Sequence, residues 1–482
     1  MQNRWLTSTV AGLGLLWFGA AGADAQTLRE AMAQAYTNSQ NLNVARAGQR
    51  ATDEGVTQAR SAMRPFITGS AGAQAQRTRT TFGDNLPNQR GRSESLSAGI
   101  QINQLLFDGF ETANNVMSAQ SQVRFGQANL ANTVQNVLLD AVTAYMDVRR
   151  DRQVAEYRRQ DLEAVREQVR AADARFEVGE GTRTDVAQAQ SQEALATALL
   201  NSALAQVAVS EANYLDVIGD APGSLAAPVR PPENLMPRSI AQALEISQAE
   251  HPAIQAQLFA VEAASFQVKA AEGSLLPELR ITGSVDNVYA LNETRGGTSA
   301  GGGGFDDLPG VRPNVTTQNQ VSATIGAQLT IPIYQGGLNA SQVREAKEVL
   351  GQRRIEVDLA RDQVRALVAA SYAQLQAAEA NVTGYRAQLA AAQLALGGVT
   401  EERSVGQRTT LDVLNARADV ISAQVLLAGS QRDVIVAAYQ LLSAIGRMDA
   451  VQLALAVEIY DPEEHYRQVE DKWHGLRTPD GR

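Results

Sequence analysis

The chain contains the stretch Val178-Gly179-Glu180-Gly181-Thr182-Arg183-Thr184-Asp185-Val186. Its second half contains the related stretch Val405-Gly406-Gln407-Arg408-Thr409-Thr410-Leu411-Asp412-Val413. In both, a threonine follows a glycine three residues later, and an Asp-Val pair comes next. A glycine just past a helix end stops the helix, and threonine with aspartate begins the next one. The two stretches therefore predict the turns of two helical hairpins.

These turns belong to an internal duplication. Residues 99–219 align without gaps with residues 326–446, so that Gly109 falls on Gly336 and Ile218-Gly219 on Ile445-Gly446. Upstream of this segment, Ile67-Thr68-Gly69-Ser70 recurs as Ile281-Thr282-Gly283-Ser284. Two copies are too few for a solenoid. We therefore expect one structural unit present twice and related by pseudo-symmetry.

Each hairpin begins with a very long helical stretch. Residues 110–178 and 338–405 contain no proline, and helices of that length would each span about 100 Å. Return helices are predicted over 184–218 and 411–445. Apolar residues at seven-residue spacing also fit an ordinary extended coiled coil. The pairing of each hairpin with a pair of strands, described next, argues against that alternative.

The hydrophobic period changes from helical to alternating upstream of each long helix. Residues 27–62 read as one helix that ends before Pro65. Strand pairs are predicted over 66–106 and 279–333, because apolar and polar residues alternate there in runs of at least ten residues, about the length of a tilted transmembrane strand. A soluble β-hairpin packed against helices is the alternative. Four strands cannot close a barrel, and open edges cannot face lipid, so strands in a membrane would require oligomerisation.

The N-terminus resembles an export signal. Arg4 supplies a positive charge, residues 10–20 are apolar, and Ala23-Asp24-Ala25 forms a cleavage site before Gln26. An uncleaved inner-membrane anchor is the alternative for residues 1–25. No other stretch approaches the length of an apolar transmembrane helix, so none is expected. The absence of cysteine excludes disulfides and a lipid-anchoring cysteine.

The remaining segments complete the domain organisation. The first repeat is assigned to 26–238, including a proline-rich connector over 220–238, and the second repeat to 239–446. The tail 447–482 loses periodicity, and both an ordered strap and a disordered end remain open. His251, which precedes Pro252, is expected on a helix surface.

The sequence offers no candidate for catalysis or for nucleic-acid binding. The three histidines lack the spacing of metal ligands, and no nucleophile–base arrangement is visible. The glycine-rich run 296–304 is not followed by the Lys-Ser/Thr of a phosphate loop. A net charge of −10 without a basic stripe argues against a nucleic-acid partner. We expect no enzyme activity, no cofactor and no metal.

The order helix, strand pair, long helix and return helix, present twice with V-G-x-x-T and D-V at each turn, resembles the TolC-like outer-membrane efflux and secretion channels. The resemblance covers essentially the whole chain after residue 25. It implies a mixed α+β membrane protein and a homotrimer. Three chains with four strands each would close a twelve-stranded β-barrel in the cell outer membrane. Their helices would close a long α-helical barrel in the periplasm.

The resemblance also implies roles for residues at the turns. Asp412 matches an acidic residue at the narrow periplasmic entrance, and a second acidic position one helical turn later is Asn415 here, which predicts a weaker negative ring. The tips that meet the periplasmic adaptor protein are matched by Gly179, Thr182, Gly406 and Thr409. Helix capping is the alternative role for these threonines and for the aspartates.

A latch between the two turns is implied in the same way. Arg408 matches the basic residue that joins the second turn to the first, with Thr184 and Asp185 as its acceptors. A second latch position, an aromatic residue in some members, is Arg403 here.

The implied function is that of a passive exit duct. Its partners would be the adaptor, an inner-membrane ABC or RND transporter, and the lipid of the outer membrane. Drug efflux and type I protein secretion both remain open, because the inner-membrane transporter selects the substrate. The alternative is a periplasmic coiled-coil scaffold or adaptor without a pore, which would have no need of amphipathic strands.

Overall fold

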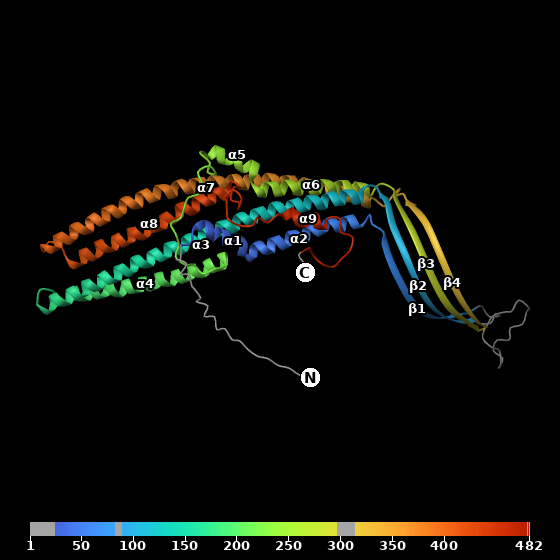
Figure 1. Ribbon diagram of the computed structural model, residues 1–482, viewed down its shortest axis with the longest axis horizontal. Helices are drawn as coiled ribbons and strands as arrows, with labels where there is room; N and C mark the ends of the chain where they lie inside the picture. The colour runs from blue at the N-terminus through green and yellow to red at the C-terminus, as the bar shows by residue number, and fades with distance from the viewer. Residues whose placement is uncertain (1–24, 82–88, 296–313, 480, 482) are drawn as a thin grey trace, which may run out of the picture. The chain divides into compact units, whose positions relative to one another are not determined.

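The computed structural model describes residues 25–81, 89–295, 314–479 and 481 (Figure 1). Its first half contains, in order, α1 (Leu28–Asn38), α2 (Gln40–Ser61), β1 (Phe66–Thr80), β2 (Gln89–Asp108), α3 (Glu111–Glu177) and α4 (Arg183–Ile218). Its second half contains α5 (Ile240–Glu250), α6 (Pro252–Gly273), β3 (Glu278–Arg295), β4 (Asn314–Thr330), α7 (Leu338–Ser404), α8 (Thr410–Ala444) and α9 (Pro462–Val469). Every element from α1 to α4 thus has a counterpart from α5 to α8, as the duplication predicts.

The long helices and their return helices form as predicted. Helices α3 and α7 each contain 67 residues without interruption, which corresponds to about 100 Å. Helices α4 and α8 follow after short turns and contain 36 and 35 residues. Both α4 and α8 also include a window that is long and apolar enough, by length and composition, to cross a membrane, although the sequence analysis expects no such helix. Much of that hydropathy comes from alanine, valine and leucine spread between polar residues rather than from one continuous run.

The four strands form one antiparallel sheet in the order β1-β2-β3-β4 (Figure 1). The central pair, β2 with β3, joins the two copies of the repeat. Strand β2 extends to Asp108, slightly past the predicted end. The prediction that the last strand reaches residue 333 is wrong. Thr330 pairs with Glu278, the first residue of β3, so Ile331 and Ile333 lie beyond the last pair of this ladder in the described part of the chain.

The helix preceding each strand pair is broken in two, which corrects the single helix predicted over 27–62. Ser39 lies between α1 and α2 with a non-helical ψ of 120°, and its hydroxyl accepts a hydrogen bond from the Leu42 amide, as an N-cap does. His251 occupies the same place between α5 and α6.

His251 is buried, at 5% exposure, and not on a helix surface as expected. Gly446 packs against its backbone so closely that a Cβ there would lie 2.8 Å from the His251 Cα. Burial lowers the pKa of the imidazole, so this histidine is neutral near pH 7.

The chain divides into two compact units. One contains the described residues up to 44 together with 131–251 and 364–459, and therefore holds both helical turns and the connector. The other contains 45–130, 252–363 and 460–482, and therefore holds the sheet, the sheet-proximal ends of α3 and α7, and the end of the chain.

The described part of the tail is an ordered strap on α2, which decides between the two alternatives. His465 Nδ1 lies 2.9 Å from the fully buried carboxylate of Asp53. Arg64 donates to the Lys472 carbonyl at 2.8 Å and stacks over the Trp473 ring. These contacts tie the α9 segment to the helix that leads into β1. The predicted signal peptide lies outside the described residues apart from Ala25, as does the glycine-rich run 296–304.

Candidate functional site

Each helical turn is stopped by the glycine that the sequence indicated. Gly179 and Gly406 both have φ of +80°, a left-handed conformation that side chains other than glycine rarely adopt. The amide of the next residue then bonds back to the helix, from Glu180 to the Arg175 carbonyl and from Gln407 to the Glu402 carbonyl. A Cβ at either glycine would meet nothing within 4 Å. Both tips therefore present open surface.

Each return helix begins with a complete capping box. Thr182 accepts from the Asp185 amide while Asp185 accepts from the Thr182 amide, and Thr409 and Asp412 make the same reciprocal pair. The capping role considered as an alternative for these four residues is therefore present. The hydrogen bonds from Thr182 lower the pKa of Asp185, and those from Thr409 lower the pKa of Asp412. Both carboxylates are thus ionised at neutral pH.

The two residues assigned to the entrance ring lie in the first turns of α8. Asp412 is half-buried, and Asn415 is exposed. The backbone amide and the hydroxyl of Thr409 both donate to Asp412 Oδ2. The carboxylate can therefore cap the helix and still contribute its charge to a pore.

The latch partners predicted for Arg408 are not those found. In the described part of the chain, Arg408 Nε donates to Glu402 Oε2 at 2.7 Å, within the second turn itself. The carboxylate of Asp185 accepts a hydrogen bond from the Thr182 hydroxyl instead. The reason is local geometry, because Glu402 lies just before the same turn and reaches Arg408 without crossing to the other hairpin.

Arg403 makes the contact between the two copies that had been assigned to Arg408. Its guanidinium donates to Gln168 Oε1 of α3 at 3.0 Å. Burial and the nearby positive charge of Arg175 lower the pKa of Arg403. The Arg403–Gln168 hydrogen bond therefore forms close to the like charge of Arg175, and its acceptor, a neutral amide, does not compensate that charge.

Two further links between α8 and α3 escaped the sequence reading. Arg417 Nε lies 3.2 Å from Asp161 Oδ1, and Arg432 Nε lies 2.9 Å from Asp147 Oδ1. The side chains are shielded, with Asp161 at 12% exposure and Arg432 at 20%. The acceptors Asp147, Asp161 and Gln168 stand at multiples of seven residues along α3. That spacing places them on one helix face and was the available signal.

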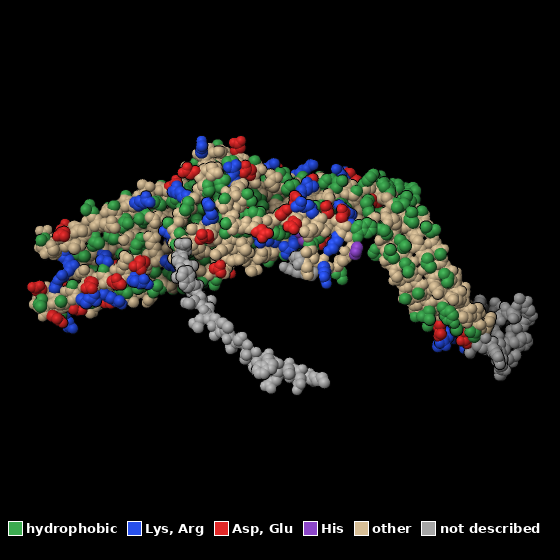
Figure 2. All heavy atoms as spheres, in the orientation of Figure 1, with side chains coloured by type: hydrophobic (Ala, Val, Ile, Leu, Met, Phe, Trp, Pro, Cys, Tyr) green, Lys and Arg blue, Asp and Glu red, His purple; other side chains and the backbone are tan. Residues whose placement is uncertain are grey.

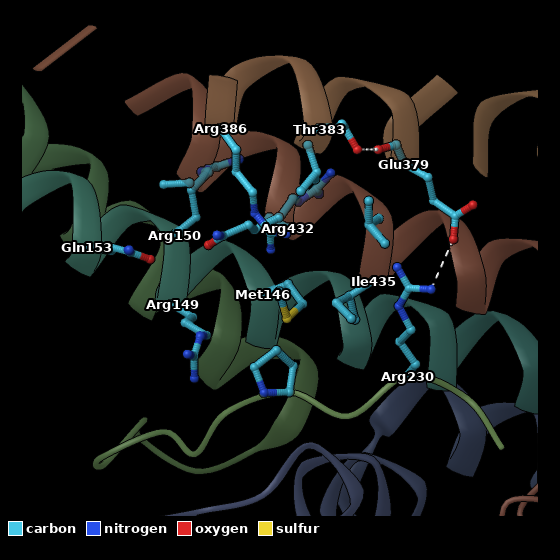
Figure 3. A pocket seen from close by; sticks show the side chains of 15 residues that line it. Met146, Arg149, Arg150, Gln153, Arg230, Glu379, Thr383, Arg386, Arg432 and Ile435 are labelled. Atoms are coloured by element: carbon cyan, nitrogen blue, oxygen red, sulfur yellow. Dashed lines mark hydrogen bonds and ion pairs between the residues drawn. The ribbon is translucent and has the colours of Figure 1, made fainter. Parts of the chain in front are cut away.

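Arg432 also borders a cavity of about 440 Å³ lined by α3, α7, α8 and the connector (Figure 3). Arginines surround it, but most are neutralised by acidic partners. Arg230 pairs with Glu379 across the opening, and Arg150 pairs with Asp147 and Asp151. The Arg432–Asp147 link thus lies at the wall of this cavity.

The register of the sheet separates an apolar face from a polar one. One ladder runs Ile67, Ile102, Gly283 and Ile325, and its neighbour runs Gly69, Ile100, Val285 and Ala323. Their apolar side chains are highly exposed, Ile325 at 84%. Figure 2 shows hydrophobic side chains spread along the sheet. Such a face suits lipid rather than water.

The opposite face of the sheet is polar. The ladder between the two apolar ones consists of Thr68, Gln101, Ser284 and Thr324. Because side chains alternate along a strand, these four polar side chains point to the other face. On the same face, a Cβ at Gly99 would collide with the Asp286 carboxylate, so the glycine makes room for this charge. Strands that alternate between lipid-facing and lumen-facing residues have this pattern.

The comparisons with known proteins agree with this geometry. The family model described as outer membrane efflux protein matches residues 31–219 and 243–447, one segment in each repeat. The chain is 48% identical over 457 residues to the outer membrane efflux protein BepC of Brucella suis, covering 95% of this chain and 93% of that protein. It is 25% identical to the outer membrane protein TolC of Escherichia coli, covering 93% and 87%.

A solved structure shows the same fold. The CmeC outer membrane channel of Campylobacter jejuni superposes with a TM-score of 0.71 at 14% identity, covering 98% of both chains. Together with the duplicated match of the family model, this supports an outer-membrane efflux or secretion channel whose helical part lies in the periplasm, rather than a scaffold without a pore. The chain belongs to the outer membrane efflux protein family.

Proposed function

We propose that this protein is the outer-membrane exit duct of a tripartite export system. It would conduct substrates passively from an inner-membrane ABC or RND transporter, through a periplasmic adaptor, to the outside, without enzyme activity. The observation that carries the proposal is the sheet, which has one apolar face, one polar face and two unpaired edges, on β1 and β4. The exposed turns at the ends of α3 and α7 provide surface for the adaptor.

The unpaired edges predict a homotrimer. Four strands are fewer than the eight of the smallest membrane barrels, and three copies bring β4 of one chain beside β1 of the next. Protein extracted from outer membranes is expected to run as a detergent-stable trimer by light scattering and to form ion-conducting pores in planar bilayers. A folded monomer, or a trimer that never conducts, would contradict the proposal.

We further propose that three Asp412 carboxylates set the cation preference of the entrance. Negative charges near a narrow axis attract cations, and Asn415 leaves the ring without a second set of charges. The variant Asp412→Asn is expected to lower the cation-to-anion permeability ratio at least twofold, measured as a smaller reversal potential in a salt gradient. Asp185→Asn is the matched control, because it alters the equivalent capping box and no proposed ring residue.

The ionisation of Asp412 gives this proposal a pH dependence. Hydrogen bonds from Thr409 hold the pKa of Asp412 below its ordinary value of 3.8, so the carboxylate is charged at pH 5 as well as at pH 7. The cation preference due to Asp412 should therefore be constant between pH 7 and pH 5. A preference that titrates away within this range, or that Asp412→Asn leaves intact, would place the selective charge elsewhere.

A further inference from the structure

Arginines gather at the end of the sheet where the β1–β2 and β3–β4 connections lie. Arg77 and Arg79 on β1 stand directly opposite Arg92 and Arg90 on β2. Like charges placed opposite each other destabilise a strand pair. The four arginines, together with Glu293, line a hollow of about 430 Å³. Figure 2 shows charged side chains gathered at this end of the sheet. We call these four residues the arginine patch.

The arginine patch lies on the lipid-facing side of the sheet. Side chains alternate along a strand, so Arg77 and Arg79 share the face of Ile67 on β1, and Arg90 and Arg92 share that of Ile100 on β2. The ladders between these positions contain no bulge. The one irregularity of β2 lies at Leu105/Phe107, toward the opposite end.

The position of the arginine patch along the strand matches the edge of a membrane. Arg77 follows Ile67 by ten residues, which is about 33 Å along the strand and about 25 Å along the normal of a barrel whose strands tilt by about 40°. That is the height of the apolar band of an outer-membrane barrel. The arginines therefore lie at the headgroup level of the leaflet away from the helices, which faces the outside.

Only part of the positive charge is neutralised within the chain. Arg92 pairs with Glu94. No hydrogen bond or ion pair joins Arg77, Arg79 or Arg90 to another residue in the described part of the chain. Planar guanidinium groups bind phosphate oxygens through two parallel hydrogen bonds. Phosphate groups in the headgroup layer would offset the repulsion between the opposed arginines.

We propose that the arginine patch binds the phosphate groups of the phosphorylated glycolipid that forms the outer leaflet. The ligand is held outside the barrel wall, so the patch anchors the trimer in the membrane and does not contact exported substrate. Binding of this lipid requires that the protein lies in the outer membrane, but it does not depend on which substrate the protein exports. Free phosphate has the same chemistry but lacks the acyl chains that would lie along the apolar ladders below the patch.

Native mass spectrometry of the purified trimer with bis-phosphorylated lipid A tests the proposal. The triple variant Arg77→Gln, Arg79→Gln and Arg90→Gln should weaken lipid A binding at least tenfold. The matched control Arg158→Gln, Arg344→Gln and Arg354→Gln removes the same charge from helices and should bind as the parent does. Dephosphorylated lipid A should bind the parent at least tenfold more weakly than the phosphorylated form.

Two additional measurements separate lipid A binding from a failure to form trimers and from the binding of free phosphate. If the glutamine variant does not form trimers, the triple variant Arg77→Lys, Arg79→Lys and Arg90→Lys takes its place. It keeps the charge but loses the paired hydrogen bonds of the guanidinium groups, so its binding of lipid A should be weaker than that of the parent and stronger than the parent's binding of the dephosphorylated lipid. Inorganic phosphate at equal phosphate concentration should not displace lipid A. The proposal is overturned by parental binding in the glutamine variant, by equal binding of the dephosphorylated lipid, or by displacement with free phosphate.

Discussion

Replacing Gly179 and Gly406 together by leucine is expected to reduce export in intact cells at least a hundredfold while the trimer remains in the outer membrane. Both glycines lie at the exposed turns, and a Cβ at either would meet nothing within 4 Å of its own chain. A leucine therefore projects into the space that a docking partner must occupy. The measurement is dye efflux or protein secretion in cells that lack the chromosomal copy.

Alanine at the same two positions separates docking from backbone strain. Both glycines have φ of +80°, so alanine and leucine carry a similar cost of about 1–2 kcal/mol per turn. Alanine adds little volume, and the alanine variant should retain most of the export. If leucine and alanine reduce export equally, the backbone conformation matters and the turn surface does not. If neither reduces it, the tips are not the docking surface.

Removing the links between α8 and α3 is expected to raise single-channel conductance severalfold. Arg417 and Arg432 hold α8, which carries Asp412, to the carboxylates of Asp161 and Asp147. Breaking a fully buried ion pair costs about 3–5 kcal/mol. These side chains are partly exposed, so we expect about 1–2 kcal/mol for each pair. Each 1.4 kcal/mol changes an equilibrium tenfold, so the double variant Arg417→Ser and Arg432→Ser should shift the entrance strongly toward open.

Three comparisons decide whether these links act as the latch. Arg408→Ser should leave conductance close to that of the parent, because its partner Glu402 belongs to the same turn. Arg403→Ser should have an intermediate effect, because it removes one hydrogen bond to Gln168. Arg353→Ser breaks the Arg353–Glu356 pair within α7 and is the control. If Arg408→Ser raised the conductance more than the double variant did, the latch would lie at the turn and not at the links between α8 and α3.

The sequence alone determined the strands, the long helices, the return helices and their order, because their signals are local. It did not predict the break between α1 and α2 or the short helix α9. Alternation of apolar and polar residues predicted the strands. Long proline-free stretches with helical periodicity predicted α3 and α7. The N-caps are also local, because Thr182 and Thr409 each pair with an aspartate three positions later, Asp185 and Asp412. The duplication then assigned every element of one copy a counterpart in the other.

The break between α1 and α2 at Ser39 is a local cap, but other differences between prediction and structure come from contacts distant in the chain. The end of β4 at Thr330 depends on where its partner β3 begins. The burial of His251 depends on Gly446, which packs against it from the far end of the second copy. The ordered strap formed by the tail depends on the contact of His465 with Asp53, which lies 412 residues earlier in the chain.

The partners of the site residues divide in the same way between local and distant contacts. Local signals placed Arg403 at the end of α7, Arg408 in the turn and Asp412 in the first turn of α8. Glu402 is the partner of Arg408 because it lies six residues away at the same turn. The choice of Gln168 for Arg403 and of Asp161 for Arg417 depends instead on how the second hairpin packs against α3. A sequence specifies helix faces through spacing. Which side chains of two faces meet is decided only when the helices pack, because that sets their rotation and relative offset.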